Sequence, residues 1–279
     1  MTTLRLACTG KVPFGEDTSS NVEKKPALLI SYYYLDNVLK HMKKHTDYQF
    51  RNWAMDSGAF SAHHSGAAID LQEYIERCQQ LLKTDPKLVE IFALDVIGNW
   101  RLSMKNLEKM WDAGVEAIPC YHSGEPWDVL LHIAKNYPKI ALGGIAEAPR
   151  NFRLEFMRQS MARIWPKKVH GFGVTDESII MALPFHSVDA TSWIFGPCAY
   201  AQWMRYGHLS LPNTVTESSL PAEVEMYLEI ERRAKVRWKD EMVLLDTLEK
   251  PKPAKYDFKK EIVNVSSNQE NGDSGKPQA

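Results

Sequence analysis

The sequence predicts an α/β fold of parallel strands joined by helices, and two observations carry this prediction. Short apolar runs recur along the chain, each bounded by Gly, Asp or Pro. Each run is followed by a segment in which apolar residues return every three to four positions, the period of an amphipathic helix. This alternation is typical of a parallel sheet with crossover helices. With 279 residues, the chain can form one large barrel or two smaller domains.

Seven strands are expected from the apolar runs, and the position of an eighth is left open by the pattern. Their spacing of roughly 20 to 35 residues fits a closed (β/α)8 TIM-type barrel, regular or irregular, or an open doubly wound sheet. No GxGxxG motif follows the first strand, which favours the barrel. The expected strands are Ala27–Tyr33, Asn52–Asp56, Val89–Asp95, Val115–Cys120, Lys139–Gly143, Val169–Gly173 and Phe185–Asp189.

Helices are expected between these strands, and the segment from Asp70 to Leu82 has the strongest pattern. Asp70 and Glu73 have the spacing of a capping box. The others are Ser103–Trp111, Trp127–Ala134, Phe152–Ile164 and a long charged C-terminal helix, Pro221–Glu249. We therefore expect one barrel domain with a helical extension over residues 1–249, followed by a disordered tail over residues 250–279.

Charge and cysteine content restrict the function classes. The 34 Lys and Arg residues nearly balance 35 Asp and Glu, so nucleic acid would have to bind a local basic face. The N-terminus lacks a signal pattern and no apolar run is long enough for a membrane span, so we expect a cytoplasmic protein without membrane contact. No two of the four cysteines form a CxxC pair, which favours reduced thiols over disulfides or a structural zinc; they are Cys8, Cys78, Cys120 and Cys198. We expect no metal and no cofactor.

Acidic residues and glycines collect at the expected strand ends. Function in an α/β barrel lies at the carboxyl ends of the strands. Asp56, Asp95 and Asp189 each end an expected strand, and Gly143 and Gly144 stand at the end of another. The glycines would let a flat ligand approach bare backbone. Each feature alone is weak, since Asp before Ser-Gly is usually a turn, but together they point to a site.

Five short motifs carry a more specific resemblance. They are MDSGAFS (Met55–Ser61), ALD (Ala93–Asp95), LGGIA (Leu142–Ala146), HGFGV (His170–Val174) and HSVDATSW (His186–Trp193). In this order they resemble the tRNA-guanine transglycosylase superfamily, and especially its compact branch, often encoded by phages, which inserts 7-deazaguanines into DNA. The resemblance covers roughly residues 27–193. It implies exchange of guanine in a nucleic acid for a free 7-deazaguanine such as preQ0, in the host cytoplasm if the protein is phage-encoded.

The resemblance also implies roles for individual residues. Asp189 matches the nucleophile, Asp56 the general acid/base, and Asp95 the acceptor for the Watson-Crick edge of guanine. The remaining base-binding candidates are Gly143, Gly144, Ser57, Phe60 and His122, with Tyr121 and Phe172 as further rings that could sandwich the base. The sequence departs from the family at Ala59, which replaces a glycine, and in having no glutamine between Tyr121 and Gly124. It also lacks the CxCxxC zinc motif of the tRNA enzymes.

Carboxylates suit this reaction. Replacing a base with retained stereochemistry is simplest by two inversions through a covalent sugar-enzyme intermediate. One carboxylate attacks the sugar while the other, in a different environment, transfers the proton of the departing and incoming bases. Because a duplex hides the glycosidic bond, the target nucleotide must be flipped out or unpaired.

Basic residues near the fifth crossover are candidate phosphate contacts, with a solvated helix face as the alternative. They are Arg150, Arg153, Lys167 and Lys168, and a second cluster lies on the C-terminal helix. Without a zinc motif or an added RNA-binding domain, DNA is favoured as the partner, and tRNA is the alternative. A non-catalytic partner subunit is a further alternative, and a homo-oligomer or a partner protein is compatible with the sequence. A glycoside hydrolase is disfavoured because glutamate is missing from the strand ends.

Overall fold

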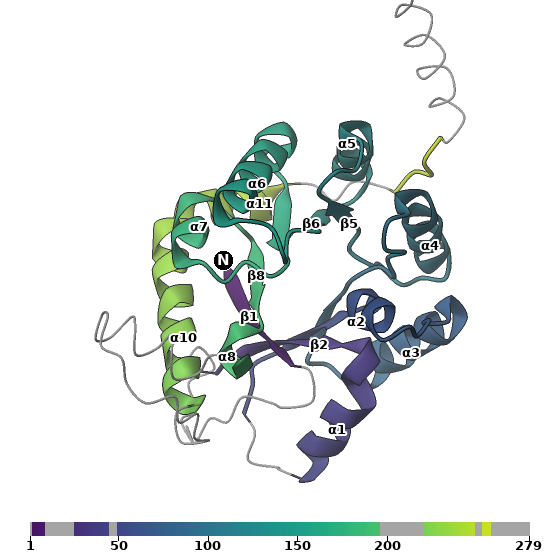
Figure 1. The fold of residues 1–279 in the computed structure, drawn as a ribbon, viewed down its shortest axis with the longest axis horizontal. Coiled ribbons are helices and arrows are strands. Elements are labelled where there is room, and N and C mark those ends of the chain that lie inside the picture. Colours follow the sequence, from purple (N-terminus) through teal and green to yellow (C-terminus); the bar gives the residue numbers. More distant parts are fainter. Residues whose placement is uncertain (1, 9–24, 45–48, 196–219, 249–252, 258–279) are drawn as a thin grey trace, which may run out of the picture.

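Eight parallel strands form one curled sheet of the TIM-barrel type (Figure 1). The computed structural model describes residues 2–8, 25–44, 49–195, 220–248 and 253–257. The sheet order is β4-β3-β2-β1-β8-β7-β6-β5, which follows the chain around the barrel apart from the position of its seam. The strands are β1 (Thr3–Cys8), β2 (Ala27–Ser31), β3 (Trp53–Asp56), β4 (Leu88–Ile91), β5 (Cys120–His122), β6 (Lys139–Gly143), β7 (Lys168–Gly171) and β8 (Ser187–Ala190).

The seam lies between β4 and β5, where the ladder is reduced to a single bridge. Phe92 and Ile118 form an isolated parallel bridge just beyond β4 and before β5. The Ala93 amide donates to the Ile118 carbonyl at 2.9 Å, and the Ile118 amide donates to the Ile91 carbonyl at 2.7 Å. These bonds draw the two edge strands together, so the sheet curls round as a barrel does.

The eighth strand is β1, which the apolar pattern did not reveal. Arg5 interrupts its apolar run, yet β1 pairs with both β2 and β8 in the middle of the sheet. Another difference concerns the expected strand Val115–Cys120, because regular pairing begins only at Cys120. Pro119 has no amide hydrogen to donate to a ladder, which explains the late start. The expected strand Lys139–Gly143 coincides with β6.

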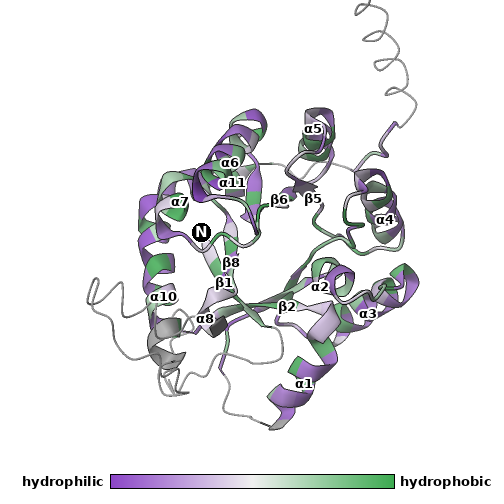
Figure 2. Ribbon diagram, in the orientation of Figure 1, coloured by the Kyte–Doolittle hydropathy of each residue, from purple (hydrophilic) through white to green (hydrophobic). Residues whose placement is uncertain are grey.

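Helices follow the strands and surround the sheet, and purple and green alternate along them as expected of amphipathic helices (Figure 2). The Asp70 cap is confirmed, since its carboxylate accepts the Glu73 amide at 2.9 Å. The helices are α1 (Leu35–Lys44), α2 (Ala59–His64), α3 (Leu71–Thr84), α4 (Trp100–Asp112), α5 (Trp127–Asn136), α6 (Arg150–Ile164), α7 (Glu177–Ala182), α8 (Ser192–Phe195), α10 (Leu220–Arg237) and α11 (Lys239–Thr247), and a 3-10 turn spans Tyr32–Tyr34.

The expected single C-terminal helix is divided into α10 and α11 at Trp238. The Trp238 indole is buried and donates to the Ile180 carbonyl at 2.9 Å, which anchors the break on α7. Part of the expected tail also packs on the barrel. The Tyr256 ring lies edge-on to Trp100, with ring centroids 5.4 Å apart, and its amide donates to Glu108 at 2.7 Å. Residues 249–252 and 258–279 lie outside the described ranges.

The barrel interior has two kinds of filling. Small and apolar side chains occupy its middle, namely Ala7, Leu29, Ala54, Phe92, Ile118, Cys120 and Ala141, with Phe172 packed against them. Toward the ends where the strands begin lies a set of polar residues that we call the charged layer: Arg5, Glu90, Lys139 and Ser187. Such interiors are usually built from branched apolar residues, so this polar layer is unusual.

Each charge in the charged layer has an oppositely charged partner. Glu90 accepts from Arg5 at 2.8 Å and from Lys139 at 2.6 Å, and Lys139 also donates to the Ser187 hydroxyl at 2.7 Å. Burial lowers the pKa of Lys139 to about 8, while Glu90 opposes that shift. Burial acts to raise the pKa of Glu90, but Lys139 and Arg5 overcome it and hold this pKa well below its usual range.

Two further observations concern the cysteines and the helices of the described part. Cys8, Cys78 and Cys120 are buried free thiols, and Cys198 lies outside the described residues. Of the helices that the structure describes, none combines the length and the apolar character needed to cross a membrane.

Candidate active site

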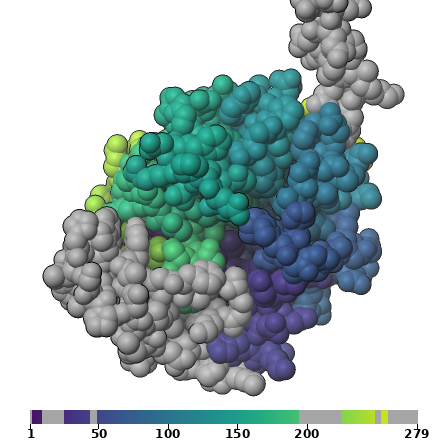
Figure 3. All heavy atoms as spheres, viewed as in Figure 1, coloured from purple at the N-terminus to yellow at the C-terminus, as the bar shows by residue number. Residues whose placement is uncertain are grey.

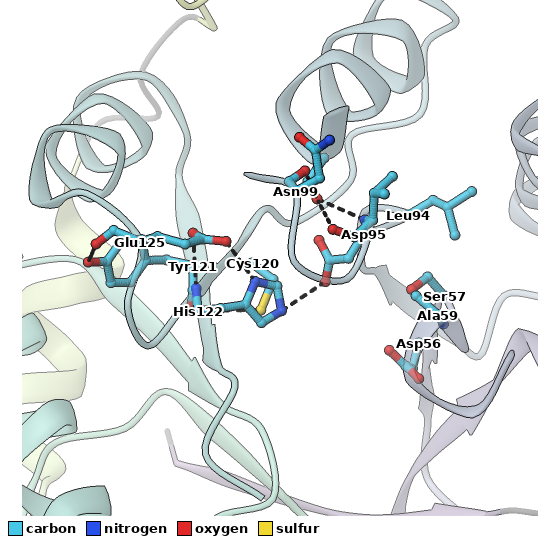
Figure 4. A network of polar contacts seen from close by, with 12 residues as sticks. Asp56, Ser57, Ala59, Leu94, Asp95, Asn99, Cys120, Tyr121, His122 and Glu125 are labelled. Carbon is cyan, nitrogen blue, oxygen red and sulfur yellow. Dashed lines mark hydrogen bonds and ion pairs between the residues drawn. The ribbon is translucent and has the colours of Figure 1, made fainter. Parts of the chain in front are cut away.

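Asp56, Asp95 and Asp189 converge at the carboxyl ends of the strands. Asp56 ends β3, Asp95 follows β4, and Asp189 lies in β8. The charges of Asp189 and Asp95 both act on Asp56 and raise its pKa. Figure 4 shows Asp95 between the Asp56 turn on one side and His122 of β5 on the other. The three carboxylates therefore lie at the same end of the barrel.

The carboxyl group of Asp56 has a strongly raised pKa. Burial, followed by the charge of Asp189, raises its pKa from 3.8 to about 7, although hydrogen bonds from the backbone of Gly58 and Ser57 oppose the rise. The Gly58 amide donates to its carboxylate at 3.1 Å. Its side chain remains partly accessible. A carboxyl that holds a proton near neutral pH can act as a general acid and then as a general base.

Asp189 is buried and held by one oxygen. Its Oδ1 accepts the Gly173 amide at 2.8 Å, and Nε2 of His170 lies 3.4 Å from the same atom. Gly173 has a φ of +65°, a left-handed conformation that glycine adopts readily. Among the described residues no hydrogen bond occupies Oδ2, so that oxygen is available to attack an electrophile.

Asp95 faces a histidine that is held from both sides (Figure 4). His122 Nε2 lies 3.4 Å from Asp95 Oδ2, and its Nδ1 lies 3.1 Å from Glu125 Oε1. Burial lowers the pKa of His122, but Cys120 and Asp95 outweigh burial and raise it well above its ordinary value. An imidazolium between two carboxylates accounts for this arrangement. No sequence pattern pointed to Glu125, although it stands only three positions after His122.

The same residues include a set of metal-ligand types. One ligand atom each from Asp95, Cys120 and His122 lies within 4.8 Å of the others, the one such set in the part of the chain that the structure describes. These donors suit zinc, and Glu125 on the far nitrogen resembles the outer support of metal-bound histidines. However, burial raises the pKa of the Cys120 thiol to about 12. Since an imidazolium already satisfies both carboxylates, nothing in the geometry requires an ion, and the absence of a metal stays a prediction.

The DSG motif shapes the turn that carries Asp56. Gly58 has a φ of +77°, and a Cβ placed there would lie 2.7 Å from the Tyr33 amide nitrogen, so only glycine fits. Ser57 is buried, and its hydroxyl accepts the Ala59 amide at 3.4 Å. Both residues have a structural role in the turn, and base contact by Ser57 stays a prediction.

Gly143 and Gly144 allow β6 to approach the end of β5 closely. A Cβ on Gly143 would lie 3.1 Å from Cys120 Sγ, and one on Gly144 would lie 3.0 Å from the His122 Cβ. Their carbonyls accept from Ser123, through its amide at 3.2 Å and its hydroxyl at 2.6 Å respectively. The glycines therefore have a packing role, and their expected contact with a base stays a prediction.

Of the rings expected to sandwich a base, two stand near the site and one does not. Phe60 is 52% exposed at the start of α2. Phe172 packs against His170 inside the barrel, with ring centroids 4.6 Å apart. Tyr121 is buried outside the barrel against Trp127, which contradicts the expectation. Side chains alternate along β5, so the inward position of His122 turns Tyr121 outward.

A cavity of about 340 Å³ opens beside Asp95, between α2 and the segment after β4. This volume is within the range of small-molecule sites. Its polar lining comes from Asp95, His63 and Asn106, whereas Asp56 and Asp189 are not part of it. A second cavity of about 10 Å³ lies under Asp95 and would hold roughly one water. Figure 3 shows the blue segment with α2–α4 and the teal segment with α5–α7 meeting on the face seen in Figure 1.

The four predicted phosphate contacts do not form one patch. Arg150 begins α6, on the side where β6 ends, and pairs with Asp176 at 2.5 Å. Arg153, in the next turn, is half-buried. Lys168 begins β7 and pairs with Asp246 at 2.6 Å. It therefore stands with Lys167 at the opposite end of the barrel from the aspartates, which separates these two lysines from the site.

Comparisons with known proteins add the following. No family model matches the chain, and no curated protein matches it. Among solved structures, a protein from Coccidioides immitis described as a fructose-1,6-biphosphate aldolase is 11% identical, with a TM-score of 0.49, over 87% of this chain and 92% of its own. A mutant tryptophan synthase alpha-subunit from Pyrococcus furiosus is 13% identical, with a TM-score of 0.44, over 82% and 97%. Such weak likeness carries nothing about activity, and the barrel assignment rests on the strand order.

Proposed function

We propose that the protein exchanges a guanine base in a nucleic acid, DNA in the first place, for a free 7-deazaguanine. In this proposal Asp189 is the nucleophile, Asp56 the general acid/base, and Asp95 with His122 the pair that recognises the base. It combines the motif resemblance with the convergence of the three aspartates. The observation that supports it most is the contrast between Asp56, with a pKa near 7, and the adjacent Asp189 carboxylate.

This contrast suits a double displacement. Oδ2 of Asp189 attacks C1′ of the sugar as the bond to guanine breaks, and the proton of Asp56 goes to the departing base. The incoming 7-deazaguanine then loses a proton to Asp56 while its ring nitrogen attacks C1′ and displaces Asp189. Atoms and charges balance without a further reactant. Burial of Asp189 removes competing water from the covalent intermediate.

Base recognition would centre on Asp95, which follows β4, with His122 of β5 beside it. The carboxylate of Asp95 accepts hydrogen bonds from N1 and the exocyclic amine of guanine, which adenine does not present in that pattern. His122, whose ring nitrogens face Asp95 and Glu125, would hold the Asp95 carboxylate in place for this contact. The cavity beside Asp95 offers room for a substituent on the base.

The test is base exchange by the purified chain. Guanine-containing single-stranded DNA, duplex DNA and unmodified tRNA are incubated with labelled guanine, then with preQ0, and their nucleosides are analysed by mass spectrometry. We expect incorporation into DNA and a loss of about 10,000-fold in Asp189→Asn, in line with removal of a covalent nucleophile. Asp246→Asn, at the far end of the barrel, is the matched control and should exchange at the wild-type rate.

Each other outcome revises the proposal. Exchange into tRNA alone would retain the chemistry and replace the substrate. Exchange by Asp189→Asn at the wild-type rate would exclude this nucleophile. Binding of nucleic acid without exchange in any arm would favour the non-catalytic partner subunit.

A further inference from the structure

His170 is a fully buried side chain that the reaction scheme above does not use. It lies on β7 beneath the Asp189 carboxylate and packs against Phe172. Its Nδ1 is 2.9 Å from the Ser187 hydroxyl, and its Nε2 is 3.4 Å from Asp189 Oδ1. Among the described residues no hydrogen bond of normal geometry satisfies this Nε2, and the Asp189 oxygen is the acceptor that lies near it. Its two nitrogens therefore connect the charged layer to the candidate nucleophile.

The hydrogen bonds that link Lys139, Ser187 and His170 are satisfied when each group donates to the next one along this series. Lys139 has donors and no acceptor, so its contact at 2.7 Å must donate to the Ser187 oxygen. The Ser187 oxygen could accept a second bond, but the proton of this fully buried hydroxyl would then have no acceptor among the described residues. Ser187 therefore donates to His170 Nδ1, which is an unprotonated acceptor. Burial lowers the pKa of His170, with Lys139 acting in the same direction, so a neutral ring is favoured. A neutral ring with a bare Nδ1 carries its proton on Nε2, facing Asp189.

We propose that His170 is a positioning residue for Asp189, with Ser187 and Lys139 fixing the ring tautomer that points Nε2–H at Oδ1. Together with the Gly173 amide at 2.8 Å, this gives Oδ1 two donors and leaves Oδ2 for attack. The contact of 3.4 Å is long, as such contacts often are before substrate binds. The consequence for catalysis rests on the proposed function, whereas the tautomer itself does not.

The first experiment reads the tautomer without any activity. Nitrogen-15 NMR of histidine-labelled protein distinguishes protonated from bare ring nitrogens, and the His170 signals are assigned by their loss in His170→Gln. We expect a bare Nδ1 and a protonated Nε2, and a shift of the Nε2 signal in Asp189→Asn. A proton on Nδ1, on both nitrogens, or an Nε2 signal that ignores Asp189→Asn would overturn the proposal.

The second experiment reads positioning in the base-exchange assay. His170→Leu removes the donor, whereas the amide of His170→Gln can reach the same oxygen. We expect kcat to fall about 100-fold in His170→Leu and about 10-fold in His170→Gln, with KM unchanged, as for a misplaced reacting group. Ser187→Ala, which leaves the His170 ring in place, should lower kcat by about 10-fold through the tautomer.

The matched control is His186→Gln, which alters the histidine next to Ser187 in the sequence; this side chain is half-buried and its Nδ1 has no hydrogen-bond partner. Its kcat should not change. Equal losses of kcat in the two His170 variants, tracking their loss of melting temperature, would reduce His170 to a packing residue and overturn the proposal. If the wild type itself shows no exchange, the proposed function fails, and the NMR result alone decides whether the Lys139–Ser187–His170 chain orients Asp189.

Discussion

Buried charge is arranged differently at the two ends of the barrel interior. Where the strands begin, Arg5 and Lys139 share the carboxylate of Glu90, so opposite charges meet. Where the strands end, Asp56 lies beside Asp189 and like charges meet, which raises the pKa of Asp56. Paired buried charges are satisfied and serve the fold, whereas facing carboxylates cost stability and persist at sites that use them. The difference is the one expected if the first end serves the fold and the second end carries the proposed chemistry.

The largest effect on stability should come from breaking the paired end. Lys139→Met leaves a hydroxyl and part of a carboxylate unsatisfied in the interior, and removing one partner of a buried pair typically costs about 3–5 kcal/mol. We expect a loss of this size in the free energy of unfolding, measured by urea denaturation. Lys135→Met, on the exposed face of α5, should change it by less than about 0.5 kcal/mol. Equal stability of the two variants would refute the structural role of the charged layer.

Removing a charge at the other end of the barrel should instead increase the free energy of unfolding. Asp56→Asn removes a carboxyl that burial and Asp189 disfavour when charged. At pH 8 we expect a gain of about 2 kcal/mol in unfolding free energy, discounted for the partial exposure of the side chain. Base exchange should fall about 100- to 10,000-fold because the proton carrier is lost. A destabilised variant with full activity would show that Asp56 serves the turn instead.

The pH dependence sharpens this contrast. Because the pKa of Asp56 is raised in the folded state, from 3.8 to about 7, the folded chain holds a proton there that the unfolded chain has released. Its contribution to stability is therefore present below about pH 4 and is lost as the pH rises toward 7. We expect the difference in stability between Asp56→Asn and wild type to grow over this window and to level off above it. A difference that is flat with pH would rule out the raised pKa.

These two ends also differ in how far the sequence reveals them. The group of aspartates at the carboxyl ends of the strands could be predicted, because Asp56, Asp95 and Asp189 end strands that the apolar runs predict. The carboxyl ends of strands converge in any α/β barrel. The charged layer was hidden because Arg5 breaks the apolar run of β1, and an inward charge is indistinguishable from an exposed one until its partners on distant strands are known. Buried pairing of this kind is a property of the closed barrel and not of any segment.

The sequence also did not show which side chains point into the barrel. The expectation for Tyr121 was wrong because side chains alternate along a strand, and the short segment around β5 does not show which alternate set faces inward. His170 was noted in the sequence only as the start of the HGFGV motif, since its contacts with Ser187 and Asp189 lie on another strand, β8. Asp70 was predicted correctly because a helix cap involves residues only three positions apart.

The smallest expected effect concerns nucleic acid, and it compares the two ends through their basic residues. Arg150 lies on the side of the aspartates but already pairs with Asp176, so its contact with a phosphate would replace an existing ion pair. We expect Arg150→Ala to weaken binding of single-stranded DNA by about two- to five-fold, with a slightly shallower salt dependence. Lys168→Ala, at the opposite end, should leave affinity unchanged. Fluorescence anisotropy at several salt concentrations measures both affinities. A larger loss of affinity in Lys168→Ala would place the nucleic acid at the end of the barrel that lacks the aspartates. That result would also remove the rationale for Asp189 as the nucleophile.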